Sequence, residues 1–151
     1  MIVKAIAAVA LVLAASGTGQ AWRPAAAPPP ASACLVLEQG WVRAPMAGRA
    51  MTAGYGQLHN RCTHAVSLAG LHSAQAQRIE LHRTEIIDGI SRMRPVPGLQ
   101  LAAGQHVSLE PGGLHLMLHG LQPGVVPGSQ LELEIDDGNG HWAYRLPVRA
   151  R

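Results

Sequence analysis

Residues 114–119, LHLMLH, alternate strictly between leucine and a histidine or methionine. Successive side chains of a β-strand point to opposite faces, so the leucines lie on one face and His115, Met117 and His119 lie on the other. Residues 110–113, EPGG, precede this stretch and predict a tight turn that makes it the second strand of a hairpin. The stretch therefore predicts a β-strand whose leucine face packs into a core.

The rest of the chain after residue 35 has the same β-type organisation. Apolar stretches of about five to eight residues alternate with Gly, Pro, Asn and Asp clusters, and no helical period continues over three turns. So many short strands predict a single all-β domain, an antiparallel β-sandwich. The expected strands are 35–43, 53–60, 66–72, 78–87, 90–96, 105–109, 114–119, 130–135 and 142–148.

A second hairpin is predicted at residues 87–90, IDGI. Asp-Gly suits the positive φ angles of a two-residue type I′ turn, which fixes the pairing of the flanking strands. In this register Thr84 faces Met93 across the hairpin, so Met93 lies diagonal to His82 on the same face. Two residues that are distant in sequence are thereby expected to lie close together.

The N-terminal residues have the pattern of a secretory signal peptide. Lys4 precedes the apolar stretch 5–15, which is shorter than the about 20 residues that a membrane span needs. We predict a signal peptide at 1–21 with cleavage between 21 and 33, an Ala/Pro-rich linker at 22–34, and a folded domain at 35–151. The processed protein is expected in the periplasm, near the membrane but not across it.

The two cysteines, Cys34 and Cys62, are predicted to form a disulfide, because thiols outside the cytoplasm are usually paired. Two free thiols are one alternative. A lipid anchor on Cys34 is another, since residues 31–34, ASAC, faintly resemble a lipoprotein cleavage site.

The composition argues against nucleic acid as a partner. The net charge is +3, but the Lys and Arg residues are scattered singly, and the aromatic share of 3% provides no platform for stacking bases.

The polar face of the 114–119 strand carries imidazoles and a thioether where Thr, Lys or Glu is typical of a solvent-facing strand. Thioether sulfur is a soft ligand that suits Cu(I), and imidazole binds copper in either oxidation state. Zinc sites normally use Cys, His and carboxylates. Two histidines and two methionines therefore predict one Cu(I) per chain, held by His82, Met93, His115 and Met117.

These residues resemble the motif of the periplasmic PCu(A)C copper chaperones: His or Met, ten residues, Met, twenty-one residues, then His-x-Met. The segments 79–82 (IELH), 93–96 (MRPV) and 111–118 (PGGLHLML) are also similar to that family, and the resemblance extends over about residues 41–148. It implies a cupredoxin-like fold and copper delivery to the CuA site of cytochrome c oxidase. The implied partners are the oxidase copper subunit and a thioredoxin-like, Sco-type assembly factor.

Two departures from this family pattern affect the number and identity of the ligands. The Met-rich or His-rich tail of many relatives is missing before Arg151, so we expect a single site. Position 119, often apolar or Met in relatives, is His119, which is a candidate to assist or replace a ligand.

A non-catalytic carrier is thus the expected function, and no enzyme activity is expected. The alternatives are copper storage or detoxification and an envelope interaction module without a working metal site. An electron-transfer copper protein needs a Cys thiolate beside two histidines, and neither cysteine has that setting.

Other candidates have simpler structural interpretations. Met46 and Met51 are expected to fill gaps, although shielding of the site is an alternative. Trp41 and Trp142 are expected to pack in the core or at its edge, and Asp136 and Asp137 are expected to shape a turn. Five histidines are expected to lie on the surface: His59, His64, His72, His106 and His141.

Overall fold

The computed structural model describes residues 33–150, which form eleven β-strands. The predicted signal peptide, the linker up to residue 32 and Arg151 lie outside the described residues. The strands are β1 (Leu35–Arg43), β2 (Met51–Asn60), β3 (Val66–Ser67), β4 (Gly70–His72), β5 (Ala76–Ile87), β6 (Ile90–Pro95), β7 (Gln100–Leu101), β8 (His106–Leu109), β9 (Leu114–Leu121), β10 (Gln130–Asp136) and β11 (His141–Arg149).

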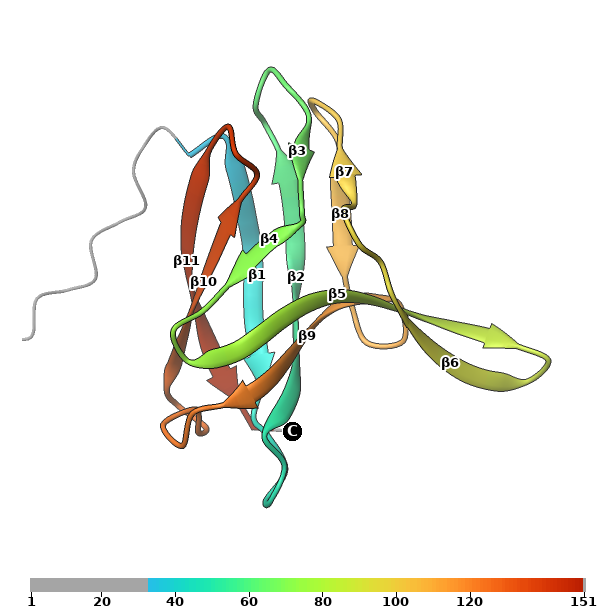
Figure 1. Ribbon diagram of the computed structural model, residues 1–151, viewed down its shortest axis with the longest axis vertical. Coiled ribbons are helices and arrows are strands. Elements are labelled where there is room, and N and C mark those ends of the chain that lie inside the picture. The colour runs from blue at the N-terminus through green and yellow to red at the C-terminus, as the bar shows by residue number, and fades with distance from the viewer. Residues whose placement is uncertain (1–32, 151) are drawn as a thin grey trace, which may run out of the picture.

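The main sheet has the order β4-β10-β11-β1-β2-β9-β5-β6, with β8 paired to β2. β1 and β11 run parallel, and the other pairs are antiparallel. Figure 1 shows β5 crossing in front of β1 and β2, so the sheet folds over into two layers that enclose a core. The predicted all-β sandwich is confirmed.

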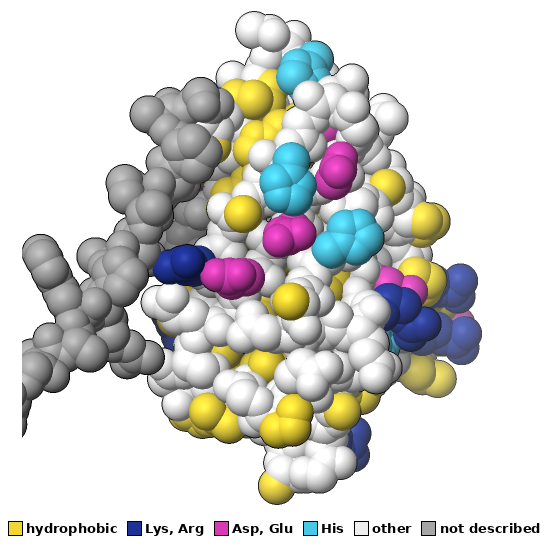
Figure 2. Space-filling model, turned by 60° about the vertical axis from the view of Figure 1, so that its left-hand side comes forward, with side chains coloured by type: hydrophobic (Ala, Val, Ile, Leu, Met, Phe, Trp, Pro, Cys, Tyr) yellow, Lys and Arg dark blue, Asp and Glu magenta, His cyan; other side chains and the backbone are white. Residues whose placement is uncertain are grey.

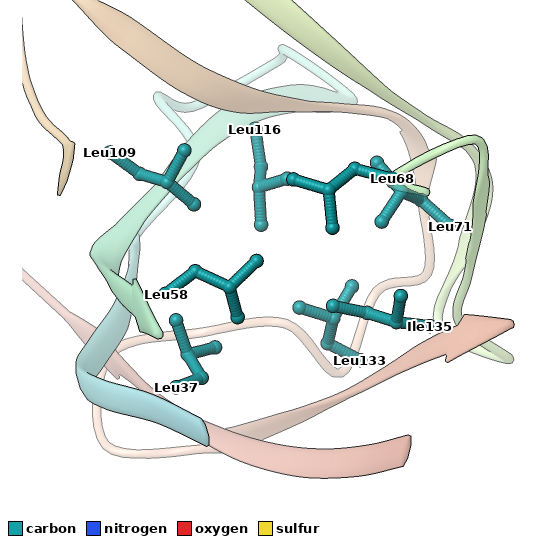
Figure 3. Close-up of a pocket in the computed structure, with 8 residues that line it drawn as sticks. All are labelled: Leu37, Leu58, Leu68, Leu71, Leu109, Leu116, Leu133 and Ile135. Carbon is teal, nitrogen blue, oxygen red and sulfur yellow. The ribbon is translucent and has the colours of Figure 1, made fainter. Parts of the chain in front are cut away.

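The core is aliphatic, as a chain without Phe requires. The leucine face of β9 is buried as predicted, with Leu114, Leu116 and Leu118 at 6%, 3% and 1% exposure. Figure 3 shows a small interior cavity surrounded by apolar side chains from both layers, so it offers no polar group to a ligand. Its lining residues are Leu37, Leu58, Leu68, Leu71, Leu109, Leu116, Leu133 and Ile135.

The predicted turn between β5 and β6 is confirmed. Asp88 and Gly89 have φ angles of 54° and 75°, as a type I′ turn requires. The register places Thr84 opposite Met93, as predicted. The resulting β5–β6 ribbon projects from the body as an arm (Figure 1).

The predicted hairpin between β8 and β9 is wrong in its strand pairing. The turn at 110–113 forms, and the Glu110 amide donates to the Leu114 carbonyl at 2.7 Å. However, the strands before and after the turn do not pair with each other, and both pair with β2. β8 pairs with residues 56–59 of β2, and β9 pairs with residues 51–54 of β2. The single long strand β2 therefore joins the two layers.

The strand predicted at 66–72 is divided into β3 and β4 because its halves have different partners. β3 pairs with β7, and β4 pairs with β10. The two-residue strand β7 was not predicted from the sequence. Gly70 lies so close to the Asp136 carbonyl that a Cβ there would clash with it. The backbone approach at this point therefore requires glycine.

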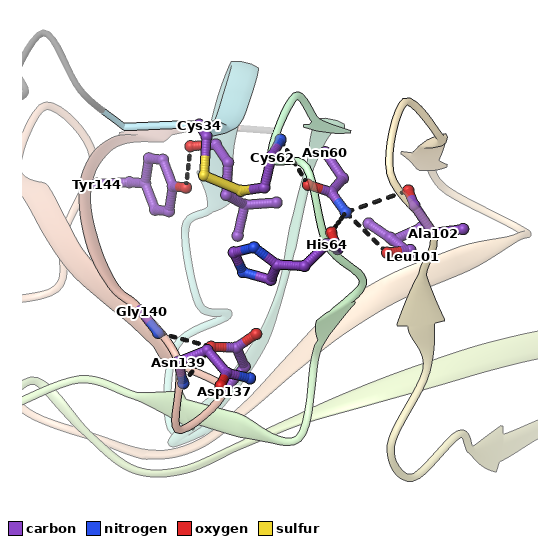
Figure 4. Close-up of a disulfide and its surroundings, with 11 residues drawn as sticks. Cys34, Asn60, Cys62, His64, Leu101, Ala102, Asp137, Asn139, Gly140 and Tyr144 are labelled. Carbon is purple, nitrogen blue, oxygen red and sulfur yellow. Dashed lines mark hydrogen bonds between the residues drawn. A yellow bond between two sulfur atoms is a disulfide. The ribbon is translucent and has the colours of Figure 1, made fainter.

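The predicted disulfide between Cys34 and Cys62 is confirmed, with Cα atoms 4.7 Å apart (Figure 4). Buried Asn60 organises the neighbouring loops: its Nδ2 donates to the Leu101 carbonyl at 2.8 Å, and its Oδ1 accepts from the Cys62 amide at 2.9 Å. The disulfide joins the start of β1 to the segment after β2. A sulfur in a disulfide cannot also carry a lipid thioether, so this pairing and a lipid on Cys34 are mutually exclusive.

Candidate metal centre

The outer face of three neighbouring strands, β6, β5 and β9, carries all four predicted copper ligands. His82 of β5 lies directly opposite His115 of β9, and their ring centroids are 6.2 Å apart. Met117 is two residues further along β9 on the same face. Met93 of β6 is opposite Thr84, which places it diagonal to His82 on that face. The structure thus brings the four residues to one face, and their role as ligands stays a prediction.

The site changes from buried to exposed across these strands. His115 is 3% exposed and Met93 is 50% exposed. The alternating pattern predicted a solvent-facing side of this strand, and for His115 this is wrong, because the side chain of buried Tyr55 lies beside it with ring centroids 6.4 Å apart. An ion here would have a dry side at β9 and an open side at β6.

The His115 ring is oriented by a backbone contact. Its Nδ1 lies 3.0 Å from the Gly113 carbonyl oxygen, which can only accept, so Nδ1 carries the proton. Nε2 then has the free lone pair that a metal requires. A hydrogen bond of this type fixes both the tautomer and the ring plane of a metal-binding histidine.

The His82 ring is oriented by Glu80. Its Nε2 donates to Glu80 Oε2 at 3.3 Å, whereas its Nδ1 is buried and has no hydrogen-bond partner. The hydrogen bond from His82 lowers the pKa of the Glu80 carboxyl below its ordinary value, against the opposing effect of partial burial, and the nearby Arg78 and His119 lower it further. Glu80 is therefore an ionised acceptor at neutral pH.

His119 completes a compact group with Glu80 and His82. Its Nε2 lies 3.4 Å from Glu80 Oε2, and one donor atom from each residue fits within 4.8 Å of the others. His119 was a candidate from the sequence, whereas Glu80 was not. The signal was available: Glu80 and His82 are two residues apart on one strand and so share a face.

Most of the other candidates match their structural interpretations. Trp142 is buried at 7% exposure, and the side chains of Asp136 and Asp137 accept hydrogen bonds from the turn that follows. Four of the five remaining histidines are exposed, namely His64, His72, His106 and His141, as expected. His59 is half buried instead and stacks on His106 with ring centroids 5.4 Å apart. Figure 2 shows separate histidine side chains on one face of the molecule. Met46 is in an exposed loop, while Met51 lies opposite His119 on β2, next to the site.

Comparison with known proteins identifies the family. A family model described as "Putative lipoprotein LpqE-like" matches residues 35–141. The chain belongs to this LpqE-like family. The chain is also 30% identical over 115 residues to "Putative lipoprotein Lxx21020" of Leifsonia xyli subsp. xyli, covering 75% of this chain and 68% of that protein.

Solved structures show that this LpqE-like chain has the fold of PCuAC domains, as the motif predicted. The copper-bound PCuAC domain from PmoF2 has a TM-score of 0.66 at 21% identity, covering 82% of this chain and 98% of that domain. Apo-DR1885 from Deinococcus radiodurans has a TM-score of 0.59 at 22% identity, covering 95% and 97%. The Cu(I) form of DR1885 has a TM-score of 0.56 at 24% identity, covering 80% and 81%.

Residues 33–150 contain no helix that is long and apolar enough to span a membrane. The family description as a lipoprotein agrees with an extracytoplasmic location.

Proposed function

We propose that this LpqE-like protein is a periplasmic Cu(I) carrier that holds one ion with His82, Met93, His115 and Met117. The observation that carries the proposal is the strand register, which brings two imidazoles and two thioethers to one face of β6, β5 and β9. Copper-bound proteins with this fold support it.

The chemistry of this donor set suits Cu(I) in an oxidising compartment. Thioethers are soft, neutral and do not form disulfides, so they bind Cu(I) without the thiolates that oxidation would consume. Both cysteines are already paired with each other. A blue-copper type of electron-transfer site, which needs a Cys ligand, is therefore incompatible with the disulfide form.

The geometry favours transfer of the ion from the β6 side. β6 is the edge strand of the projecting arm (Figure 1). Its Met93 is half exposed, whereas His115 of β9 is buried. A recipient can approach Met93 first and replace the donors one at a time.

We propose the copper subunit of cytochrome c oxidase as the recipient, with a thioredoxin-like, Sco-type assembly factor as a second partner.

Cu(I) binding is expected to weaken in mild acid. Both imidazoles must be neutral to donate, so protons compete with the ion for them, whereas thioethers do not take up protons. Once both imidazoles of the free protein are protonated, the logarithm of the dissociation constant should rise by nearly two for each unit of falling pH. A competition titration between about pH 7.5 and 4.5 measures this slope, and a flat profile would show that sulfur alone holds the ion.

Cells that lack the protein are expected to assemble less active copper oxidase when copper is scarce, and added copper should restore the activity. A carrier raises the supply of a scarce ion, which abundant ion replaces by mass action. Oxidase activity is measured across copper concentrations in the deletion strain.

The same assay separates the alternatives. A storage or detoxification protein leaves the mutant normal at low copper and impaired at high copper. An interaction module is rescued by a His115→Ala, Met117→Leu variant, whereas a carrier is not. Normal oxidase activity under copper limitation, in cells without another copper carrier, would contradict delivery.

A further inference from the structure

Glu80, His82 and His119 have the spacing of a second donor set that contains no thioether, although Met117 lies opposite Glu80 on the same face. The two imidazole Nε2 atoms lie 3.3 and 3.4 Å from the same carboxylate oxygen. One donor atom from each of the three residues lies within 4.8 Å of the others, a spacing at which a single ion can contact all three. Within residues 33–150, no other group of three His, Cys, Asp or Glu side chains comes together in this way.

The hydrogen bonding at this group is incomplete. His119 Nε2 is buried and lacks a hydrogen-bond partner, although it lies next to the carboxylate. The other charged contact of Glu80 Oε2 is Arg78 Nε at 3.4 Å, and the Arg78 side chain is 62% exposed and free to move into solvent. A buried nitrogen without a partner next to a carboxylate is the arrangement that a cation would complete.

We propose that Glu80, His82 and His119 form a binding site for Cu(II). Two imidazoles and a carboxylate are borderline to hard donors, which suit a divalent ion and not Cu(I). Among first-row divalent ions, nitrogen and oxygen sites bind Cu(II) most tightly, ahead of Zn(II). The site takes copper in its oxidised form.

His82 belongs to both donor sets. Its Nε2 faces Glu80 and His119, and that nitrogen must give up its proton when Cu(II) binds. Because the ring is shared, the protein holds one copper ion at a time, in the nitrogen and oxygen set as Cu(II) or in the set with sulfur as Cu(I). The Cu(II) site stands independently of the proposed Cu(I) carrier function, apart from this shared residue.

The test is a titration of the copper-free mature protein with Cu(II), without reductant, followed by electron paramagnetic resonance. His119→Gln and Glu80→Gln should each raise the dissociation constant by more than about tenfold. His119→Gln should also remove the coupling to one nitrogen from the spectrum. His141→Ala is the matched control, because it removes an exposed imidazole from β11. Its spectrum and affinity should equal those of the unsubstituted protein.

Cu(I) titrations of the same variants distinguish the two proposals. The Met93→Leu, Met117→Leu variant should bind Cu(II) normally, and His119→Gln should bind Cu(I) normally, which also shows that it is folded. The Cu(II) site is overturned if His119→Gln behaves like His141→Ala, or if His119→Gln loses Cu(I) as well. Unchanged Cu(I) binding by the double methionine variant overturns the carrier site and leaves the Cu(II) site intact.

Discussion

Replacing Met93 and Met117 together by leucine is expected to lower the affinity for Cu(I) by more than about tenfold while the fold survives. Leucine keeps the volume of methionine but lacks the sulfur donor, so packing changes little. Met93 is half exposed and Met117 lies on the outer face of β9, away from the leucine core. The two remaining histidines are borderline donors that hold Cu(I) less well.

A competition titration against a Cu(I) chelator under anaerobic conditions measures this loss. Met46→Leu is the control, because Met46 is 43% exposed, close to the 50% of Met93, but lies in a loop outside the β6–β5–β9 face. Its affinity should not change. Equal Cu(I) affinities for the double variant and the control would remove the methionines from the site.

Reduction of the Cys34–Cys62 disulfide is expected to lower the free energy of unfolding by about 3–4 kcal/mol. The bond closes a loop with a sequence separation of 28 residues, and this restricts the unfolded chain more than the folded one. Cys62 is buried at 5% exposure beside the Asn60 network, so the oxidised geometry fits the native packing (Figure 4). Cu(I) binding should persist, because neither cysteine is in the donor set.

Denaturant unfolding with and without reductant measures this loss of stability, with a Cys34→Ser, Cys62→Ser variant as the non-reducible reference. Mass analysis of the protein from the envelope provides an independent test. Two free thiols, or a diacylglycerol on Cys34, would contradict the disulfide and favour one of the alternatives that the sequence left open.

The sequence predicted those parts of the site that depend on residues close to one another in the chain. The Asp88-Gly89 turn fixed the β5–β6 register, and the leucine alternation fixed which face of β9 is buried. These rules depend on neighbours in the chain. They placed Met93 and His82 correctly relative to each other before any long-range contact was known.

The features that were missed depend on long-range pairing. β8 and β9 share β2 instead of pairing with each other, and the short β7 exists only because Leu101 meets Val66. The burial of His115 likewise requires Tyr55 from another strand. The group of Glu80 and His119 forms across the β5–β9 pair, and no turn signal links those strands.

X-ray absorption at the copper edge of the Cu(I)-loaded protein is the most direct test of the central claim. The proposed site predicts one Cu(I) per chain with both sulfur and nitrogen neighbours, and sulfur scattering that is lost in the Met93→Leu, Met117→Leu variant. A spectrum with nitrogen and oxygen neighbours alone, or one that the double substitution leaves unchanged, would contradict a site built from His82, Met93, His115 and Met117.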